Sequence, residues 1–224
     1  MKPSNTKRIT VSAVMLALAT VLALVCAFIP FLHLPMGGGF TVASMLPIVI
    51  ISYMYGIKWG LFTSLTYAAI QIIMDLCTGV GSSTVMALFM PNSDSYMGIV
   101  AAISILVIDY LIAYSVLGLG GLFRKSIKNK TVALCLGSIV ALSLRFLAHT
   151  VSGAIFYGQW AEWFLTQEDA WFLPFGLWIV EHINGVWLAI IYSVFYNGLY
   201  MIPEIIITAI AAVAVSTIKP LQKQ

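Results

Sequence analysis

The chain has 224 residues, of which 61% are hydrophobic and only 8% are charged, and its formal net charge is +3. Soluble domains carry about 25% charged residues, so this chain lacks the polar surface that a cytosolic enzyme, a nucleic-acid-binding protein or a disordered scaffold needs. The composition predicts an all-α integral membrane protein, because helices satisfy their own backbone hydrogen bonds in lipid.

Taken in chain order, six apolar stretches are near or above the length of a membrane-spanning helix, about 17–25 residues. Prolines and glycines interrupt the chain after the first stretch, and polar or basic loops separate the later ones. We therefore expect one membrane domain over residues 1–224, with an external insertion at about 158–187. The predicted spans are 9–30, 41–57, 59–77, 97–123, 131–157 and 188–218.

Basic residues indicate how these spans are oriented. In a six-span arrangement, ten of the eleven lysines and arginines fall on one side, and the other side carries acidic residues without basic ones. Because short basic loops stay in the cytoplasm, we expect both termini there and the protein in the cell membrane. The ten are Lys2, Lys7, Arg8, Lys58, Arg124, Lys125, Lys128, Lys130, Lys219 and Lys223.

A seven-span alternative divides the last region into helices at 171–190 and 203–218. It would place Glu181 and His182 inside a span, where charged groups cost several kcal/mol. The six-span arrangement avoids this cost, so we prefer it.

Tryptophan is concentrated in the insertion at 158–187. One interpretation is an aromatic belt at the membrane–water interface, and the other is a lid over an aromatic ligand. Five of the six tryptophans of the chain lie there: Trp160, Trp163, Trp171, Trp178 and Trp187.

Three spans each place one ionisable residue at a similar depth. At about 1.5 Å per residue, Asp109, Arg145 and Glu204 lie roughly 21–22 Å above the cytoplasmic ends of their helices. His149 lies one turn further out, on the same helix face as Arg145. The polar groups thus occupy the outer half of the membrane, which predicts a pocket that is open outside and sealed inside. Arg145 and Glu204 can contact a ligand there, or Arg145 can pair with either acid and only tie helices together.

Two acids and one base leave this layer with one net negative charge. Tyrosines at a similar level add aromatic faces, so the pocket would suit an aromatic monocation. Gly153, one turn beyond His149, would leave room for the ligand.

The sequence contains no recognisable catalytic, metal-binding or nucleotide-binding motif. The three histidines lack metal-ligand spacing, the three cysteines are scattered, and the glycine run at 37–39 lacks the lysine of a phosphate-binding loop. We therefore expect no enzymatic activity, no metal and no cofactor. Transport driven by ATP would require separate subunits.

Several stretches of the chain together form a specific pattern. They are 109–113 with 118–124, 145–153 with Phe156 and Tyr157, 192–198 with 200–204, and the shorter motifs 34–38 and 44–47. These stretches resemble the thiamine-binding S component of energy-coupling factor (ECF) transporters. The resemblance covers most of the chain outside 158–187 and implies a six-helix vitamin-binding subunit that lacks its own motor.

The resemblance also implies roles for individual residues. Asp109 would meet the aminopyrimidine ring of thiamine, His149 would contact the ligand, and Tyr157 would stack on the thiazolium ring. The other implied ligand contacts are Tyr110, Tyr192 and Asn197, with Phe40 as an aromatic lid.

The family further implies docking to a transmembrane ECF coupling subunit and, through it, to two ATP-binding subunits. Ala13 and Ala17 have the spacing that lets two helices approach closely, although such pairs also occur by chance in alanine-rich helices. The expected partners are thus thiamine, these subunits and the lipid bilayer, without nucleic acid. Two alternatives remain: an S component for riboflavin or hydroxymethylpyrimidine, and a membrane enzyme or structural protein that transports nothing.

Overall fold

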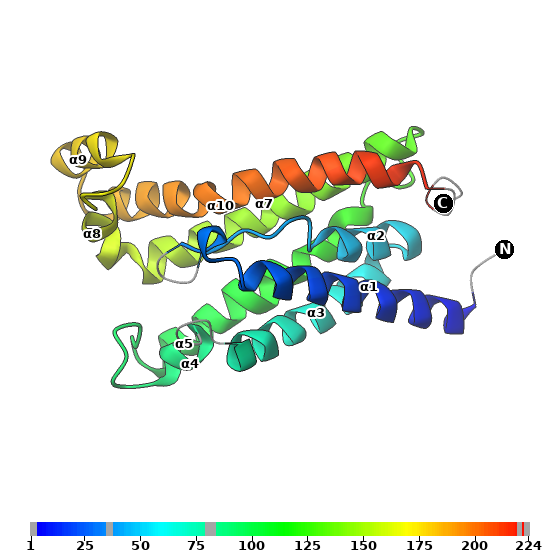
Figure 1. Ribbon diagram of the computed structural model, residues 1–224, viewed down its shortest axis with the longest axis horizontal. Helices are drawn as coiled ribbons and strands as arrows, with labels where there is room; N and C mark the ends of the chain where they lie inside the picture. Colours follow the sequence, from blue (N-terminus) through cyan, green and yellow to red (C-terminus); the bar gives the residue numbers. More distant parts are fainter. Residues whose placement is uncertain (1–3, 35–37, 79–83, 219–220, 222–224) are drawn as a thin grey trace.

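The computed structural model describes residues 4–34, 38–78, 84–218 and 221, and in these residues it contains helices and no strand. The long helices run roughly parallel and form an elongated bundle (Figure 1). Lys2, Lys219, Lys223 and residues 35–37 of the first glycine-rich motif lie outside the described residues. The elements are α1 (Asn5–Ala27), η1 (Pro30–Leu32), α2 (Leu46–Tyr55), α3 (Ile57–Thr78), α4 (Thr84–Phe89), α5 (Ile99–Ile105), η3 (Leu106–Ile112), α6 (Ala113–Ser115), η4 (Val116–Gly121), α7 (Lys130–Phe156), η5 (Gly158–Trp160), α8 (Ala161–Leu165), α9 (Leu173–His182) and α10 (Gly185–Ser216).

Five helical segments are long and apolar enough to cross a membrane. Their lengths, from 21 to 32 residues, exceed the roughly 20 residues that cover a hydrocarbon core about 30 Å thick. The chain is therefore a multi-pass, all-α membrane protein, as its composition predicts. The segments are Asn5–Ala27, Ile57–Cys77, Ile99–Gly121, Lys130–Phe156 and Gly185–Ser216.

The predicted second span, 41–57, differs from the structure. Only α2, ten residues long, is helical there, and at about 1.5 Å per residue it covers roughly half of the hydrocarbon core. The helix begins late because Pro47 occupies its first turn, where proline is best tolerated. The preceding residues form bends and turns, and two of their amides find partners in other helices: Thr41 N donates to Glu204 Oε2 at 2.6 Å, and Val42 N donates to Cys26 Sγ at 3.4 Å. Non-helical backbone is tolerated at membrane depth when it is satisfied in this way.

The two ends of the bundle differ in the way the charge pattern predicts. The ends of the chain, the α2–α3 turn and the loop before α7 gather at one end, and α4, α8 and α9 lie at the other (Figure 1). The seven-span alternative is wrong, because α10 is a single unbroken helix over Gly185–Ser216 and α9 has only ten residues.

Small residues close the end of the bundle that holds the termini. Ser52 Oγ, on α2, accepts a hydrogen bond from Gly121 N at 2.9 Å. A Cβ atom added at Gly137 would clash with the carbonyl oxygen of Gly120, so α7 and η4 are in backbone contact there. This tight packing leaves the open space of the bundle in its other half.

The insertion at 158–187 folds into η5, α8 and α9, which lie against the first turns of α10 (Figure 1). Its inner side is buried, as at Phe164 and Leu165, whereas Trp171 is 79% exposed and Trp187 is 70% exposed. No residue of 158–187 lines the large cavity described below. The wall of that cavity is therefore formed by residues outside the insertion.

Candidate functional site

A cavity of about 540 Å³ lies in the half of the bundle that carries the insertion. It is lined by the last turns of α1 and α3, the non-helical residues before α2, and the facing sides of the 99–121 segment, α7 and α10. Eight of the nine predicted ligand-binding residues line it, and the ninth, Glu204, does not. The eight are Phe40, Asp109, Tyr110, Arg145, His149, Tyr157, Tyr192 and Asn197.

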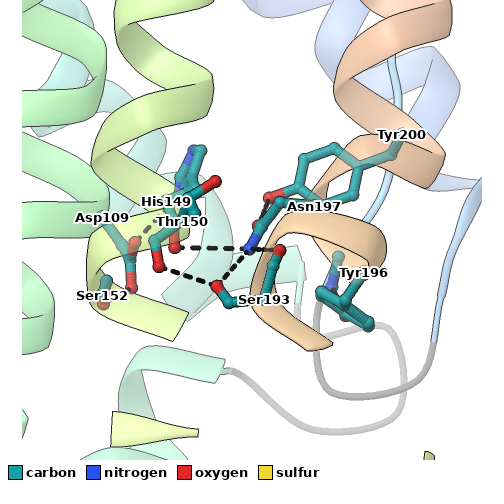
Figure 2. A network of polar contacts seen from close by, with 9 residues as sticks. Asp109, His149, Thr150, Ser152, Ser193, Tyr196, Asn197 and Tyr200 are labelled. Carbon is teal, nitrogen blue, oxygen red and sulfur yellow. Dashed lines mark hydrogen bonds and ion pairs between the residues drawn. The ribbon is translucent and has the colours of Figure 1, made fainter. Parts of the chain in front are cut away.

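Asp109 and His149 meet in the wall of this cavity (Figure 2). His149 Nδ1 lies 2.9 Å from Asp109 Oδ1, and Ser152 Oγ donates to Asp109 Oδ2 at 2.7 Å. Ser152 follows His149 by three residues, so both side chains lie on one face of α7. Asp109 belongs to the π-helical segment η3, and such local widenings of a helix frequently occur at functional sites. The result is a carboxylate held by two donors from the facing helix.

Asn197 joins α10 to α7 next to this pair (Figure 2). Its Nδ2 donates to the carbonyl oxygens of His149 at 3.3 Å and Ser193 at 2.8 Å, and its Oδ1 accepts from Tyr200 at 2.5 Å. Gly153 permits this approach, because a Cβ atom there would clash with Ser193 Oγ. The predicted reason for this glycine, room for a ligand, is therefore incomplete: its missing side chain first makes room for α10.

Arg145 lines the cavity without an acidic partner. Its guanidinium lies over the ring of Tyr114, 4.3 Å from the centroid, and Nη1 contacts Met45 Sδ. Among the described residues, neither Asp109 nor Glu204 comes within 4.0 Å of its nitrogens, and Nε is buried without a hydrogen-bond partner. The ion pair considered from the sequence does not form, and a cation–π contact takes its place.

Glu204 differs from its prediction because it faces the broken second span. It is 1% exposed, and its carboxylate accepts from Thr41 N at 2.6 Å and from Thr41 Oγ1 at 3.0 Å. It does not line the cavity. Helix rise gives the position of Glu204 along α10. The direction of its side chain depends instead on the neighbouring backbone amide, here that of Thr41, which needs an acceptor.

The acids that line the cavity are Asp75 and Asp109. Together with Arg145 they carry one net negative charge when the histidines are neutral, the charge that was predicted from a different pair of acids. Asp75 Oδ2 also accepts from Val85 N at 2.8 Å, at the start of α4. The spacing of Gln71 and Asp75, four residues apart at the outer end of a span, was the available signal for this part of the site.

Tyrosines supply most of the aromatic wall. Tyr192, Tyr196 and Tyr200 follow one another at four-residue intervals on α10, and all three line the cavity with Tyr157 from the end of α7. Tyr196 and Tyr200 were not among the predicted site residues, although the four-residue spacing from Tyr192 places them on the same helix face. Phe40 lines the cavity from the non-helical segment before α2.

Two further predictions concern groups outside the cavity. Ala13 and Ala17 are exposed on α1, on a helix whose buried residues are Ser12, Ala19, Ala23 and Cys26.

Within the described residues, no group of three or more histidine, cysteine or acidic side chains is arranged to hold a metal ion.

Comparisons with known proteins found similar sequences and a similar fold. The sequence model of the thiamine transporter protein family (Thia_YuaJ) matches residues 9–90 and 92–163. The chain is 30% identical over 207 residues to the thiamine transporter ThiT of Bacillus subtilis (strain 168), covering 88% of this chain and 84% of that protein. It is also similar in fold to the solved structure of ThiT from Listeria monocytogenes, with a TM-score of 0.56, 17% identity, and coverage of 93% of this chain and 97% of the other.

Proposed function

The chain belongs to the thiamine transporter protein family, and we propose that it is the thiamine-binding S component of an ECF importer in the cell membrane. In this role it captures thiamine from outside and does not catalyse a reaction. The observation that carries the proposal is the Asp109–His149 pair in the wall of a cavity with one net negative charge.

The donors and acceptors of this pair suit an aminopyrimidine. Asp109 is an acceptor when ionised, and His149 Nδ1 then donates to it, which leaves Nε2 as a second acceptor. Nε2 is buried and has no partner among the described residues. A ligand with an exocyclic amine supplies a donor for Nε2 or an additional donor for the Asp109 carboxylate, which already accepts from Ser152.

The tyrosines of the cavity wall suit the cationic ring of thiamine. Tyr157 and Tyr192 line the cavity and offer neutral aromatic faces, which attract a cation most strongly where water is excluded. Asp75 adds a carboxylate to the same cavity. A neutral ligand of the same shape would gain less from this wall.

Energy must come from other subunits, since no nucleotide-binding motif occurs in the sequence. A transmembrane coupling subunit would dock on the exposed face of Ala13 and Ala17, where small side chains allow close helix approach. Through it, two ATP-binding subunits would drive release of the vitamin into the cell.

Isothermal titration of the purified, ligand-free protein with thiamine, hydroxymethylpyrimidine and riboflavin tests the ligand. We expect tight one-to-one binding of thiamine, weaker binding of the isolated pyrimidine and no binding of riboflavin. Preferential binding of riboflavin or of the pyrimidine would assign the protein to another vitamin or precursor. Mass spectrometry of any small molecule that co-purifies provides an independent check.

A further inference from the structure

The insertion at 158–187 is packed directly against the tyrosine wall of the cavity. Phe164, on α8, is 3% exposed and lies at the centre of an aromatic cluster. Its ring meets Tyr192 edge-on at 5.6 Å between centroids and Tyr196 edge-on at 5.2 Å, and it stacks on Phe172 at 5.2 Å. Phe164 does not line the cavity, but both tyrosines that it touches do.

Tyr196 continues this contact to the segment on the other side of the cavity. Its hydroxyl accepts a hydrogen bond from Gly38 N at 2.9 Å, and Gly38 and Phe40 both line the cavity. A Cβ atom at Gly38 would lie 2.5 Å from the Tyr196 hydroxyl oxygen, so the fit needs glycine. Phe164, Tyr196 and Gly38 thus form a continuous line from the insertion to the residues before α2.

The insertion can act as a firm support because its own helices are locked together. A Cβ atom at Gly176, on α9, would clash with the carbonyl oxygen of Leu165 on α8, so the two backbones are in contact. Phe172 packs edge-on against Phe195 of α10 at 5.1 Å. Phe172, which stacks on the ring of Phe164, is therefore itself packed against α10.

We infer that the insertion is a buttress for the ligand site, in which Phe164 is a positioning residue that holds Tyr192 and Tyr196 in place and, through Tyr196, holds the segment beginning at Gly38 against the cavity. The inference rests on the proposed function for its effect on thiamine. A wall that is already in its bound arrangement costs less to order on binding and slows dissociation.

The test compares two variants, Phe164→Ala and Phe164→Leu, with Phe175→Ala. Phe164→Leu keeps a larger apolar side chain than Phe164→Ala but also lacks the ring. Phe175 is a matched control, because it lies in the same insertion, is 48% exposed and meets the ring of Phe195 at a tilt, without a ring contact to Tyr192 or Tyr196. We expect both Phe164 variants to raise the thiamine dissociation rate, Phe164→Ala by about tenfold for two lost aromatic contacts. Association should change by less than about twofold, as affinity differences within one site reside mainly in dissociation.

A second measurement needs no ligand. Hydrogen–deuterium exchange of the Gly38 amide in the ligand-free protein should be faster in Phe164→Leu than in the unmodified chain and in Phe175→Ala. Tyr196→Phe removes the hydroxyl that accepts the hydrogen bond from the Gly38 amide. In that background, Phe164→Leu should cause little further increase in the exchange rate of this amide. Unchanged exchange in Phe164→Leu, or an equal increase in the Tyr196→Phe background, would overturn the inference.

The two measurements separate the inference from the proposed function. Failure of the unmodified protein to bind thiamine would refute the proposed function alone, since the exchange experiment still reports on the buttress. Normal thiamine binding with unchanged exchange at Gly38 would refute the buttress alone.

Discussion

The carboxylate of Asp109 and the imidazole of His149 lie 2.9 Å apart, between Oδ1 and Nδ1, and bridge the 99–121 segment and α7 in the wall of the cavity. An ionised Asp109 fixes the tautomer of His149 by accepting its Nδ1 proton, so the other ring nitrogen can only accept. Asp109 and the buried Nε2 of His149 are therefore both hydrogen-bond acceptors.

Replacing Asp109 with asparagine should weaken thiamine binding strongly. The variant removes the charge that assists the hydrogen bond from the ligand, which is worth roughly 1.5–3 kcal/mol, or about ten- to a hundredfold in the dissociation constant. Calorimetry on the purified variant measures this change. Asp94→Asn is the control, because Asp94 is exposed and outside the cavity. An unaltered dissociation constant for Asp109→Asn would remove this residue from the site.

Truncating Tyr157 should discriminate between charged and neutral ligands. Tyr157→Ala removes an aromatic face worth up to about 2 kcal/mol to a desolvated cation, so thiamine should lose more affinity than the isolated pyrimidine. Tyr157→Phe keeps the ring and should bind thiamine nearly as the unmodified chain does. Equal losses for both ligands in Tyr157→Ala would argue against a contact between this ring and the cation.

Replacing Glu204 should lower the unfolding free energy of the protein, because its carboxylate accepts the hydrogen bond of the Thr41 backbone amide and does not line the cavity. Glu204→Ala leaves the Thr41 amide buried without its acceptor, which costs at least about 2 kcal/mol of unfolding free energy. Glu204→Gln should recover part of that loss, since the amide oxygen still accepts. Denaturation in detergent, followed without ligand, gives the comparison. Glu181→Ala is the control, because the Glu181 side chain is 79% exposed, and it should change the unfolding free energy little. An unchanged unfolding free energy in Glu204→Ala would mean that the Thr41 amide does not depend on this carboxylate.

The orientation of the bundle can be read by cysteine labelling in intact cells. The starting chain should carry Cys77→Ser, because Cys77 is exposed. A cysteine at Asp94 or Glu168, in the acidic loops at the insertion end, should react with an impermeant thiol reagent added outside. One at Ser126, in the basic loop before α7, should react only after the cells are opened. The reverse pattern would contradict the positive-inside orientation.

Bulk added to the small-residue face of α1 should separate ligand capture from transport. Ala13→Trp combined with Ala17→Trp should keep the thiamine dissociation constant within about threefold, well under 1 kcal/mol. It should prevent co-purification with the coupling subunit and abolish uptake, because the helices can no longer approach.

Val21→Trp with Val25→Trp is the matched control for that pair. These two residues are also exposed on α1 and four positions apart, but they lie near the other end of the helix. Normal uptake by the Ala13 and Ala17 pair would refute the docking role, and lost binding would mean that this face packs towards the cavity.

The predicted ligand-binding residues show which features of the site can be predicted from a single sequence. Asp109, His149 and Arg145 line the cavity as expected, because helix rise gives the depth of a residue and i, i+4 spacing gives its neighbours on the same helix. Glu204, at the same depth, turns instead to Thr41. The rotation of one helix relative to the next depends on contacts between helices, and a single sequence contains no pattern that reports them.

The sequence by itself determined the class of the protein and five of its spans, because these depend on composition and on the length of the apolar stretches. Only the tertiary structure decided that the second predicted span begins with bends and turns and becomes helical only from Leu46, since Glu204 and Cys26 of other helices accept from the amides of the non-helical part. It also brought Phe164 of the insertion into contact with Tyr192 and Tyr196. These features rest on contacts between residues far apart in the chain, which become favourable only when the helices have packed.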